Sequence, residues 1–304
     1  MILRTAKEAE SLGFDSCWVY DHFYTFPTIT ARAVFESWTC LTAISQQTTR
    51  IRLGTLVSCA AFRNPAYLAK ISSCLDVMSN GRLEFGIGAG WFGEEHLAFG
   101  YDYPKPAERI ARMEESVRIV KKMWTEEEPS FSGRYYRISN ALNYPKPMQK
   151  PHPPILIGGL GEKMTLKVVA ELADRCNTDY ETIDVIRQRL GLLRRHCDRI
   201  GRSYDEIEKT VNRGVTIAED RSDVRKKNEE IYHLLRTNKL FTKNYSMDAF
   251  LEPRITGTPD ECIKQLVQYK ELGIKYFIMN FVDCAEIDPM RLFARKVMRP
   301  VREE

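Results

Sequence analysis

The chain has 304 residues, of which 43% are hydrophobic and 28% charged, and its formal net charge is +4. This composition supplies enough apolar material for a large core, and so weak a positive charge argues against nucleic acid as a partner. No stretch approaches the roughly 20 apolar residues that span a membrane, and the first apolar segment is too short for a secretory signal. The eight cysteines form no C-x-x-C motif and no cluster with histidine, so we expect reduced thiols, no metal site and a cytoplasmic protein.

Short apolar runs alternate with helical periodicity from the beginning of the chain to its end. We predict strands at residues 16–20, 50–57, 83–87, 155–157 and 276–279, with weaker candidates at 175–177 and 211–218. Continuous apolar runs of this kind are typical of strands buried on both faces, as in parallel sheets.

Amphipathic helices are predicted between these strands. Residues 68–78 and 110–124 keep apolar side chains three and four positions apart, and Gly81 ends the first of these helices. A further helix spans residues 260–272, with Thr258 as its N-cap and Pro259 at its first position. Strand–helix alternation predicts a parallel sheet with helical crossovers, and seven strand candidates favour a barrel over an open sheet.

Two segments interrupt this alternation within what we predict to be one domain, residues 1–304. Residues 125–154 carry many prolines and include a possible hairpin at 131–136. Residues 232–256 are polar and aromatic, and we expect them to form an insertion resembling a lid. Long excursions on a barrel tend to carry substrate contacts.

The candidate site residues are those that follow each predicted strand, because a (β/α)8 barrel places its active site at the carboxyl ends of its strands. Asp21 and His22 follow the first strand and Ser58 follows the second. His22 suits acid–base work, since imidazole titrates near neutral pH. A structural histidine bonded to a carbonyl is the alternative, and position alone does not separate the two.

Glycines follow two other predicted strands. The turn at 158–161 precedes a helix that we expect to begin near Lys163, and free backbone N–H groups at such a place favour an anion. A tight turn that needs glycine for its shape is the alternative. The glycines at 86, 88 and 90 do not have the spacing of a dinucleotide-binding fingerprint.

An ordered set of motifs resembles the luciferase-like monooxygenase family, and most closely its coenzyme F420-dependent branch. The motifs are ESWT at 36–39, TRIRLGTLV at 49–57, FRNP at 62–65, LDVMSNGRL at 75–83, GIGAGW at 86–91, GRYY at 133–136, PKP at 145–147, GG at 158–159 and GTP at 257–259. The resemblance implies a (β/α)8 TIM barrel with insertions, and a homodimer.

The same resemblance implies roles for individual residues. His22 would act on a proton or stabilise charge beside the deazaflavin ring, and Leu56–Val57 matches the place of a non-prolyl cis peptide bond against that ring. Cofactor contacts would come from Asp21, Leu56, Val57, Ser58, Gly88, Ala89, Gly90, Trp91, Gly158, Gly159, Gly161 and Asn177. Lys105, Lys146, Lys150 and Lys163 are candidate contacts for the acidic tail of F420.

Three departures from the family pattern shape the expected function. Luciferases carry an arginine for the flavin phosphate where this chain has Ala89, which favours the deazaflavin. Sugar-phosphate dehydrogenases of the branch carry a catalytic glutamate where this chain has Trp91, so we do not expect a sugar phosphate, although Glu94 or Glu95 could lie close by. Family members begin with a strand ahead of the helix predicted here at 1–12, so the first barrel strand is expected to be missing and its neighbours' edges to be covered by a partner chain or a loop.

We therefore expect an enzyme that transfers a hydride between F420 and a small organic substrate, which the sequence does not identify. An FMN-dependent monooxygenase is the first alternative, and a cofactor-binding barrel without turnover is the second. Fold alone does not decide among them.

Overall fold

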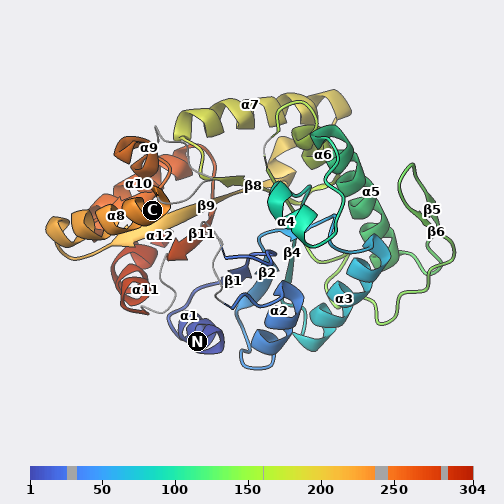
Figure 1. The fold of residues 1–304 in the computed structure, drawn as a ribbon, viewed down its shortest axis with the longest axis horizontal. Helices are drawn as coiled ribbons and strands as arrows, with labels where there is room; N and C mark the ends of the chain where they lie inside the picture. Colours follow the sequence, from blue (N-terminus) through green and yellow to red (C-terminus); the bar gives the residue numbers. More distant parts are fainter. Residues whose placement is uncertain (26–32, 160, 237–245, 282–286, 304) are drawn as a thin grey trace.

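The computed structural model describes residues 1–25, 33–159, 161–236, 246–281 and 287–303. A mostly parallel sheet curls nearly into a barrel, with helices around its outside (Figure 1). Its strands pair in the order β1–β2–β4–β7–β8–β9, and β9 pairs with both β10 and β11. The expected TIM-barrel class is confirmed, and the order of strands is that of the chain.

The strands coincide with the predicted apolar runs and add several short ones. They are β1 Ser16–Val19, β2 Arg52–Thr55, β3 Ser58–Cys59, β4 Leu83–Gly88, β5 Phe131–Ser132, β6 Arg137–Ile138, β7 Ile155–Gly158, β8 Arg175–Asp179, β9 Glu208–Ile217, β10 Ile255–Gly257 and β11 Tyr276–Phe281. All seven predicted strands are present. The short strands β3 and β10 were not predicted, because two or three residues carry no readable alternation.

The helices that cover the sheet begin and end at local sequence signals. They are α1 Ile2–Ser11, α2 Ser37–Ser45, α3 Pro65–Met78, α4 Gly93–Ala98, α5 Pro106–Thr125, α6 Thr165–Leu172, α7 Ile183–Ile200, α8 Arg221–Arg236, α9 Met247–Leu251, α10 Pro259–Glu271, α11 Ile287–Phe293 and α12 Arg299–Glu303, with a π-helix at Ala294–Met298. Thr258 is the N-cap of α10 as predicted, and together with Glu261 it forms a capping box. Asn64 caps α3 by accepting a hydrogen bond from the backbone N–H of Ala66 at 2.9 Å.

The barrel is open between β1 and β11. In the part of the chain that the structure describes, β1 pairs only with β2 and β11 only with β9. Side chains bridge the opening, where the Trp18 and Tyr276 rings lie 6.2 Å apart edge to face, as do those of Phe14 and Phe281. Helices α1 and α11 lie next to each other outside this open side (Figure 1).

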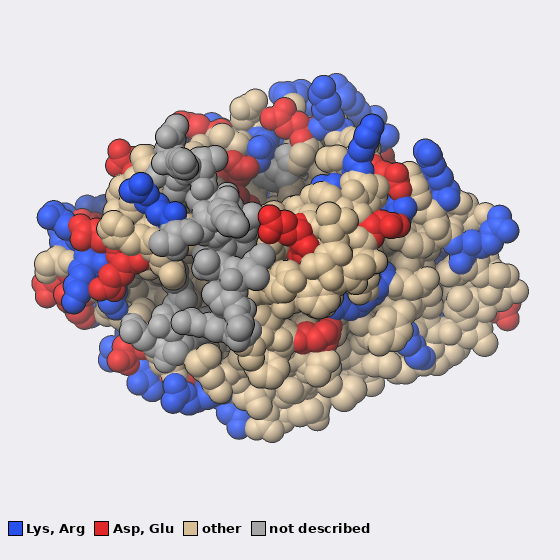
Figure 2. Space-filling model, in the orientation of Figure 1, with Lys and Arg blue, Asp and Glu red and all other residues tan. Residues whose placement is uncertain are grey.

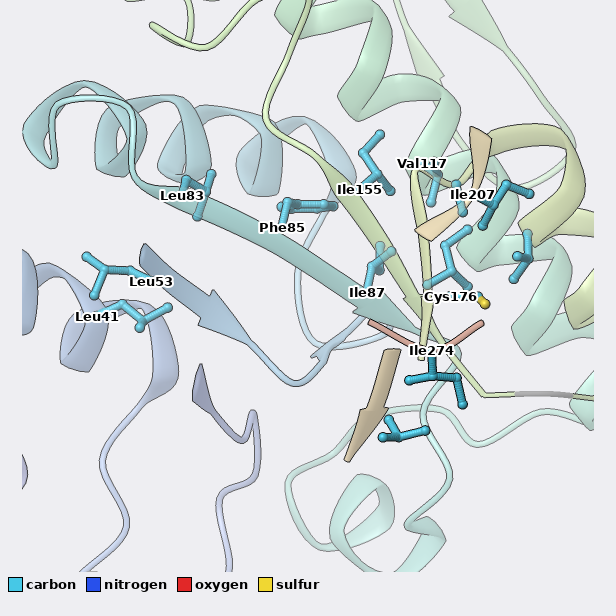
Figure 3. Packing of buried hydrophobic residues seen from close by; sticks show 14 of the residues in the cluster. Leu41, Leu53, Leu83, Phe85, Ile87, Val117, Ile155, Cys176, Ile207 and Ile274 are labelled. Atoms are coloured by element: carbon cyan, nitrogen blue, oxygen red, sulfur yellow. The ribbon is translucent and has the colours of Figure 1, made fainter. Parts of the chain in front are cut away.

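The hydrophobic core fills the barrel and the layer between sheet and helices. Figure 3 shows Leu83, Phe85 and Ile87 along β4 packing with Ile155 of β7 and Val117 of α5. All five side chains are fully buried. Burial on both faces explains why β7 carries apolar residues at the successive positions 155–157, whereas in β4 the apolar residues alternate with Glu84, Gly86 and Gly88.

A buried ionic layer lies at the amino ends of the strands, the end of the barrel opposite the expected site. Glu84 of β4 is completely buried and forms ion pairs with Arg52 and Arg175. Burial is the main cause that raises the pKa of Glu84, while the two guanidinium groups oppose the shift. These charges pair with one another and are part of the scaffold.

The two predicted excursions have outcomes that differ. Residues 125–154 form the expected hairpin, although its second strand, Arg137–Ile138, lies just beyond the predicted 131–136. Of residues 232–256, the first five belong to helix α8 and the last two to strand β10, so the predicted insertion was too long. Its centre, 237–245, lies outside the described residues.

Figure 2 shows basic and acidic side chains interspersed around the rim of one face. Within the described ranges, no helix is long and apolar enough to cross a membrane.

Candidate functional site

A surface poor in side chains lies at the carboxyl ends of β2, β4 and β7. The Leu56–Val57 peptide bond is cis, as the resemblance implied. The Val57 side chain lies against two glycines: a Cβ would come within 2.6 Å of it at Gly88 and 3.0 Å at Gly158. Gly86 is tighter still, because a Cβ there would lie 1.9 Å from the carbonyl oxygen of Thr55. We call Val57, Gly86, Gly88 and Gly158 the glycine wall.

Trp91 and His22 stand beside this wall. Gly90, at φ +76°, turns the chain after β4 and lies against Cys59 and His96. Trp91 is 53% exposed, and its ring lies 5.8 Å from that of His22 in an edge-to-face arrangement. An exposed tryptophan next to a histidine at the mouth of a barrel suits the wall of a ligand site.

His22 is held by Glu95, which belongs to helix α4. The His22 Nδ1 lies 2.9 Å from Glu95 Oε2. The other carboxylate oxygen, Oε1, accepts hydrogen bonds from the backbone N–H groups of Phe23 at 2.7 Å and Tyr24 at 3.0 Å. Glu95 is fully buried, and its pKa is nevertheless lowered, because the hydrogen bonds and the charge of His22 outweigh burial. The carboxylate therefore fixes the orientation of the imidazole ring.

Trp91 stands where sugar-phosphate dehydrogenases of the family carry a glutamate, and the sequence left open whether Glu94 or Glu95 lies near the site instead. A carboxylate does lie close to His22, but it stands four residues beyond Trp91 and is buried behind the histidine. Glu94, its neighbour, is exposed. The sequence analysis suggested both glutamates, because the sequence alone does not show which of the two side chains faces His22.

Asp21 is engaged on both of its oxygens. It accepts hydrogen bonds from Ser37 Oγ at 2.7 Å, from the Cys59 backbone N–H at 2.9 Å, and from Arg63 at 2.7 and 2.9 Å. Arg63 also pairs with Glu36, the N-cap of α2. The buried Asp21 thus ties the loop after β1 to α2 and α3 directly beside His22. The sequence analysis missed Arg63, whose partner is distant in the chain.

The predicted phosphate turn differs in part from expectation. Helix α6 begins at Thr165, two residues later than predicted, and Met164 at its N-cap makes no side-chain cap. Gly159 has φ +96° and open space where a Cβ would stand, with only Thr165 Cγ2 at 3.9 Å, whereas a Cβ at Gly161 would lie 2.8 Å from Thr165 Oγ1. Gly159 is thus the open position of this turn.

Ser58 and Asn177 are buried next to the glycine wall. Ser58 Oγ donates to Thr55 Oγ1 at 2.9 Å, and Asn177 Oδ1 accepts from Thr210 Oγ1 at 2.8 Å. Asn177 lies opposite Gly158 in the register of β7 and β8. Ser58 follows β2 as the sequence predicted and begins the short strand β3, whereas Asn177 lies in the middle of β8 and not at its end.

The four lysines suggested for an acidic tail do not share one end of the barrel. Lys146 donates to backbone carbonyls of Met123 and Glu126 at the end of α5, and Lys150 donates to the carbonyl of Pro147 ahead of β7. That end carries the amino ends of the strands, so the suggestion is wrong for these two lysines. Lys105 and Lys163 precede α5 and α6, on the side where strands end.

A second group of side chains meets at the mouth, opposite the glycine wall. Asn212 Nδ2 donates to Tyr20 Oη at 3.0 Å and to Asp179 Oδ1 at 2.8 Å. Asn280 Nδ2 donates to Tyr20 Oη at 3.0 Å and to Tyr180 Oη at 3.4 Å. We call Tyr20, Asp179, Tyr180, Asn212 and Asn280 the polar cluster. No part of the sequence analysis identified it, because its members come from four separate strand regions.

A cavity of about 1330 Å³ extends from three residues of the polar cluster to Leu56, the neighbour of Val57. Its lining includes Tyr20, Asn212 and Asn280 on one side and Leu56 on the other. It continues through the open side of the barrel toward α1 and α11, where its lining is mostly apolar. His22 and Trp91 are not among its lining residues.

Comparisons with known proteins agree with the resemblance seen in the sequence. The family model described as luciferase-like monooxygenase matches residues 1–276. An F420-dependent glucose-6-phosphate dehydrogenase of Amycolatopsis mediterranei is 25% identical over 303 residues, which cover 92% of this chain and 87% of the relative. The enzyme of the same name from Kineococcus radiotolerans is 32% identical over 226 residues, covering 71% of this chain and 63% of the relative.

Solved structures match over nearly the whole chain. A monooxygenase from Streptomyces bottropensis is 25% identical with a TM-score of 0.83, covering 98% of this chain and 92% of that one. An F420-dependent secondary alcohol dehydrogenase in complex with an F420–acetone adduct is 23% identical with a TM-score of 0.83, covering 99% and 94%. At 23% identity, the similarity to the alcohol dehydrogenase shows a shared fold.

Proposed function

Because this chain belongs to the luciferase-like monooxygenase family, we propose that it is an oxidoreductase that transfers a hydride between coenzyme F420 and a small organic substrate. The F420-dependent relatives that align along most of its length support this cofactor. The observation that carries the proposal is the His22–Glu95 pair beside the glycine wall. It combines a group able to exchange a proton with a surface that a flat ring can approach.

The residues of the mouth fit a deazaflavin. Gly88 and Gly158 present no side chain of their own at Val57, and Trp91 and His22 stand to one side. The ring would be held by Leu56, Val57, Ser58, Gly88, Ala89, Gly90 and Trp91, and the phosphate by the turn of Gly158, Gly159 and Gly161, with Asn177 near the ring. When bound, F420 supplies a two-electron hydride acceptor or donor.

His22 acts on the proton that accompanies the hydride. Since Glu95 binds Nδ1, the other ring nitrogen, Nε2, lies on the side of the ring away from this carboxylate. Nε2 accepts or returns a proton at the substrate while Glu95 stabilises the imidazolium that forms. Trp91 limits access of water to this side of the site. Asp21 anchors the loop through Ser37, Cys59 and Arg63, so its link to the cofactor is indirect.

The first experiment is a parallel titration of the purified protein with F420 and with FMN, followed by quenching of tryptophan fluorescence. Trp91 reports on a ring bound at the glycine wall. Tighter binding of F420 than of FMN supports the proposal, and substrate screening with oxidised and reduced F420 then follows. Binding of neither cofactor, or tighter binding of FMN, contradicts it.

An FMN-dependent monooxygenase is the second candidate. The monooxygenase from Streptomyces bottropensis, which matches 98% of this chain, favours it. This candidate expects FMN to bind more tightly than F420, and oxygen to be consumed in the presence of reduced FMN. The titration above therefore separates the two.

We further propose a homodimer in the cytoplasm. The seven described cysteines are free, which agrees with a reducing compartment. Size-exclusion chromatography with light scattering tests the dimer.

A further inference from the structure

The polar cluster contains hydrogen-bonding groups that the protein does not use. Tyr20 Oη accepts hydrogen bonds from two amide groups, those of Asn212 and Asn280, so neither bond uses the hydroxyl hydrogen of Tyr20. Among the described residues, no hydrogen bond takes up that hydrogen. Asn212 is completely buried, and its Oδ1 has no hydrogen-bond partner in the described part of the chain. Buried polar atoms are nearly always paired, so an unpaired one next to a cavity points to a ligand.

The cluster is open to solvent and at the same time surrounded by protein. Tyr20 is 43% exposed and Tyr180 39% exposed. Burial is nevertheless the main cause that raises the pKa values of Tyr20, Tyr180 and Asp179, the last to about 6. Tyr20, Asn212 and Asn280 line the cavity that also reaches Leu56. Asp179 lies beside this lining, hydrogen-bonded to Asn212 at 2.8 Å.

The available groups include both a donor and acceptors. Tyr20 offers an O–H, and Asp179 offers a carboxylate that has used Oδ1 in one hydrogen bond to Asn212. Tyr20 Oη and Asp179 Oδ1 accept hydrogen bonds from the same amide nitrogen of Asn212. The two side chains are therefore close enough for a single ligand group to reach both. A hydroxyl group satisfies both, because it accepts from Tyr20 and donates to Asp179.

The charged group that forms a hydrogen bond within the cluster is the carboxylate of Asp179. In the described ranges, no lysine or arginine side chain hydrogen bonds to the side chains of the cluster. The two arginines whose charge acts on it are held elsewhere. Arg213 donates to Tyr269 Oη and to the carbonyls of Asn212 and Glu181, and Arg254 lies against Gly214 and donates to Thr216. Among the described residues no cation binds Asp179 directly, so a phosphate held against this carboxylate beside Asn212 meets a like charge.

We propose that the polar cluster is the part of the substrate site that binds a neutral hydroxyl-bearing group, and that it selects such a substrate over its phosphorylated counterpart. This inference rests on the proposed function for its chemistry, since the hydroxyl-bearing group belongs to the molecule that exchanges the hydride. Tyr20 donates to the hydroxyl oxygen, Asp179 accepts its hydrogen, and Asn212 and Asn280 hold both in place. The substrate class is a neutral alcohol or polyol, or the corresponding hydroxylated carbonyl compound.

The test is calorimetric titration of the F420-loaded protein near neutral pH with two matched pairs of probes, glucose with glucose 6-phosphate and glycerol with glycerol 3-phosphate. We expect the neutral member of each pair to bind about tenfold more tightly. Asp179→Asn keeps the size of the side chain and removes its charge, so the preference should fall to about threefold or less. Tyr20→Phe should weaken both neutral probes by about tenfold.

Asp184→Asn is the matched control, since Asp184 is an exposed aspartate on α7, and we expect it to leave the preference unchanged. Tighter binding of the phosphorylated probes, a preference that Asp179→Asn leaves intact, or no binding of either neutral probe overturns the inference. Failure of F420 to bind in the fluorescence titration contradicts the proposed function instead. The same probes can then be titrated into the protein without cofactor. This second titration tests the polar cluster by itself, so failure of the proposed function and failure of this inference are told apart.

Discussion

The glycine wall and the polar cluster face each other across one barrel mouth, and they are built in opposite ways. The wall consists of backbone and of one packed valine, and a single added carbon would collide with its neighbours at Gly86 and Gly88. The cluster consists of long polar side chains with hydrogen-bonding groups to spare. The wall therefore suits a group whose shape never changes, such as a cofactor ring, and the cluster suits a substrate. Mutations on the two sides should accordingly have different effects.

The largest expected effect comes from His22, which stands beside the wall. We expect His22→Asn to lower the turnover number by about 100-fold or more, because general acid–base catalysis contributes roughly 10²–10⁴ in rate. Affinity for F420, measured by tryptophan quenching, should change by less than about threefold, since the wall itself is intact. Unchanged turnover would assign the proton step to another group.

The wall should not tolerate a side chain at its tightest point. We expect Gly86→Ala to destabilise the fold by about 3 kcal/mol, because the new Cβ would meet a backbone oxygen that has no room to move. Gly191→Ala, in the middle of α7 where nothing lies within 4 Å, is the control and should stabilise by about 0.5–1 kcal/mol. Urea unfolding of both variants gives the comparison. Equal stability of Gly86→Ala and the parent would show that the wall can relax.

Glu95 connects the wall side to catalysis through His22. We expect Glu95→Gln to lower turnover by roughly tenfold, because it replaces a charge-assisted hydrogen bond to the imidazole with a neutral one. Glu94→Gln, one residue away and exposed, should have turnover close to that of the parent. An equal loss of turnover in both variants would point to a general effect on α4 rather than on His22.

The cluster side should show its effect in stability, and the effect should be small. Burial raises the pKa of Asp179 to about 6 from its ordinary value of 3.8. The folded state therefore favours protonated Asp179, and this contribution is present below about pH 4 and is lost as pH rises through 6. We expect Asp179→Asn to be more stable than the parent at pH 7 by at most about 1 kcal/mol, since solvent reaches this side chain. The difference should vanish at pH 4 in thermal unfolding, and a difference independent of pH would assign it to packing.

The sequence predicted the wall far better than it predicted the cluster. Gly88, Gly158 and Leu56–Val57 lie in short motifs directly after apolar strands, so their place in the fold follows from local pattern and family resemblance. Tyr20, Asp179, Asn212 and Asn280 carry no motif. They meet only because the fold brings four strand regions together, and side chains that converge through tertiary structure leave no periodic signal.

Charged partners were hidden for a similar reason. Arg63 belongs to the FRNP motif noted in the sequence analysis, but its partner Asp21 is 42 residues away. Glu95 is 73 residues from His22. The lysines at 146 and 150 were misjudged because the sequence does not show which end of the barrel an excursion visits. Elements could thus be predicted from local spacing, and pairings between them could not.

The open side of the barrel bears on how the molecule folds and opens. The hydrogen bond from Asn280 to Tyr20 joins residues 260 positions apart, and that from Arg291 to Glu8 spans 283 positions. Contacts this distant in sequence close last, because the entropy of the intervening chain must be lost before they form. The strands behind the glycine wall are neighbours in chain order and can assemble earlier. Native-state hydrogen exchange should therefore release β1 and β11 together at low free energy while β4 and β7 remain protected, so that the substrate side of the mouth can open and close around a cofactor side that stays formed.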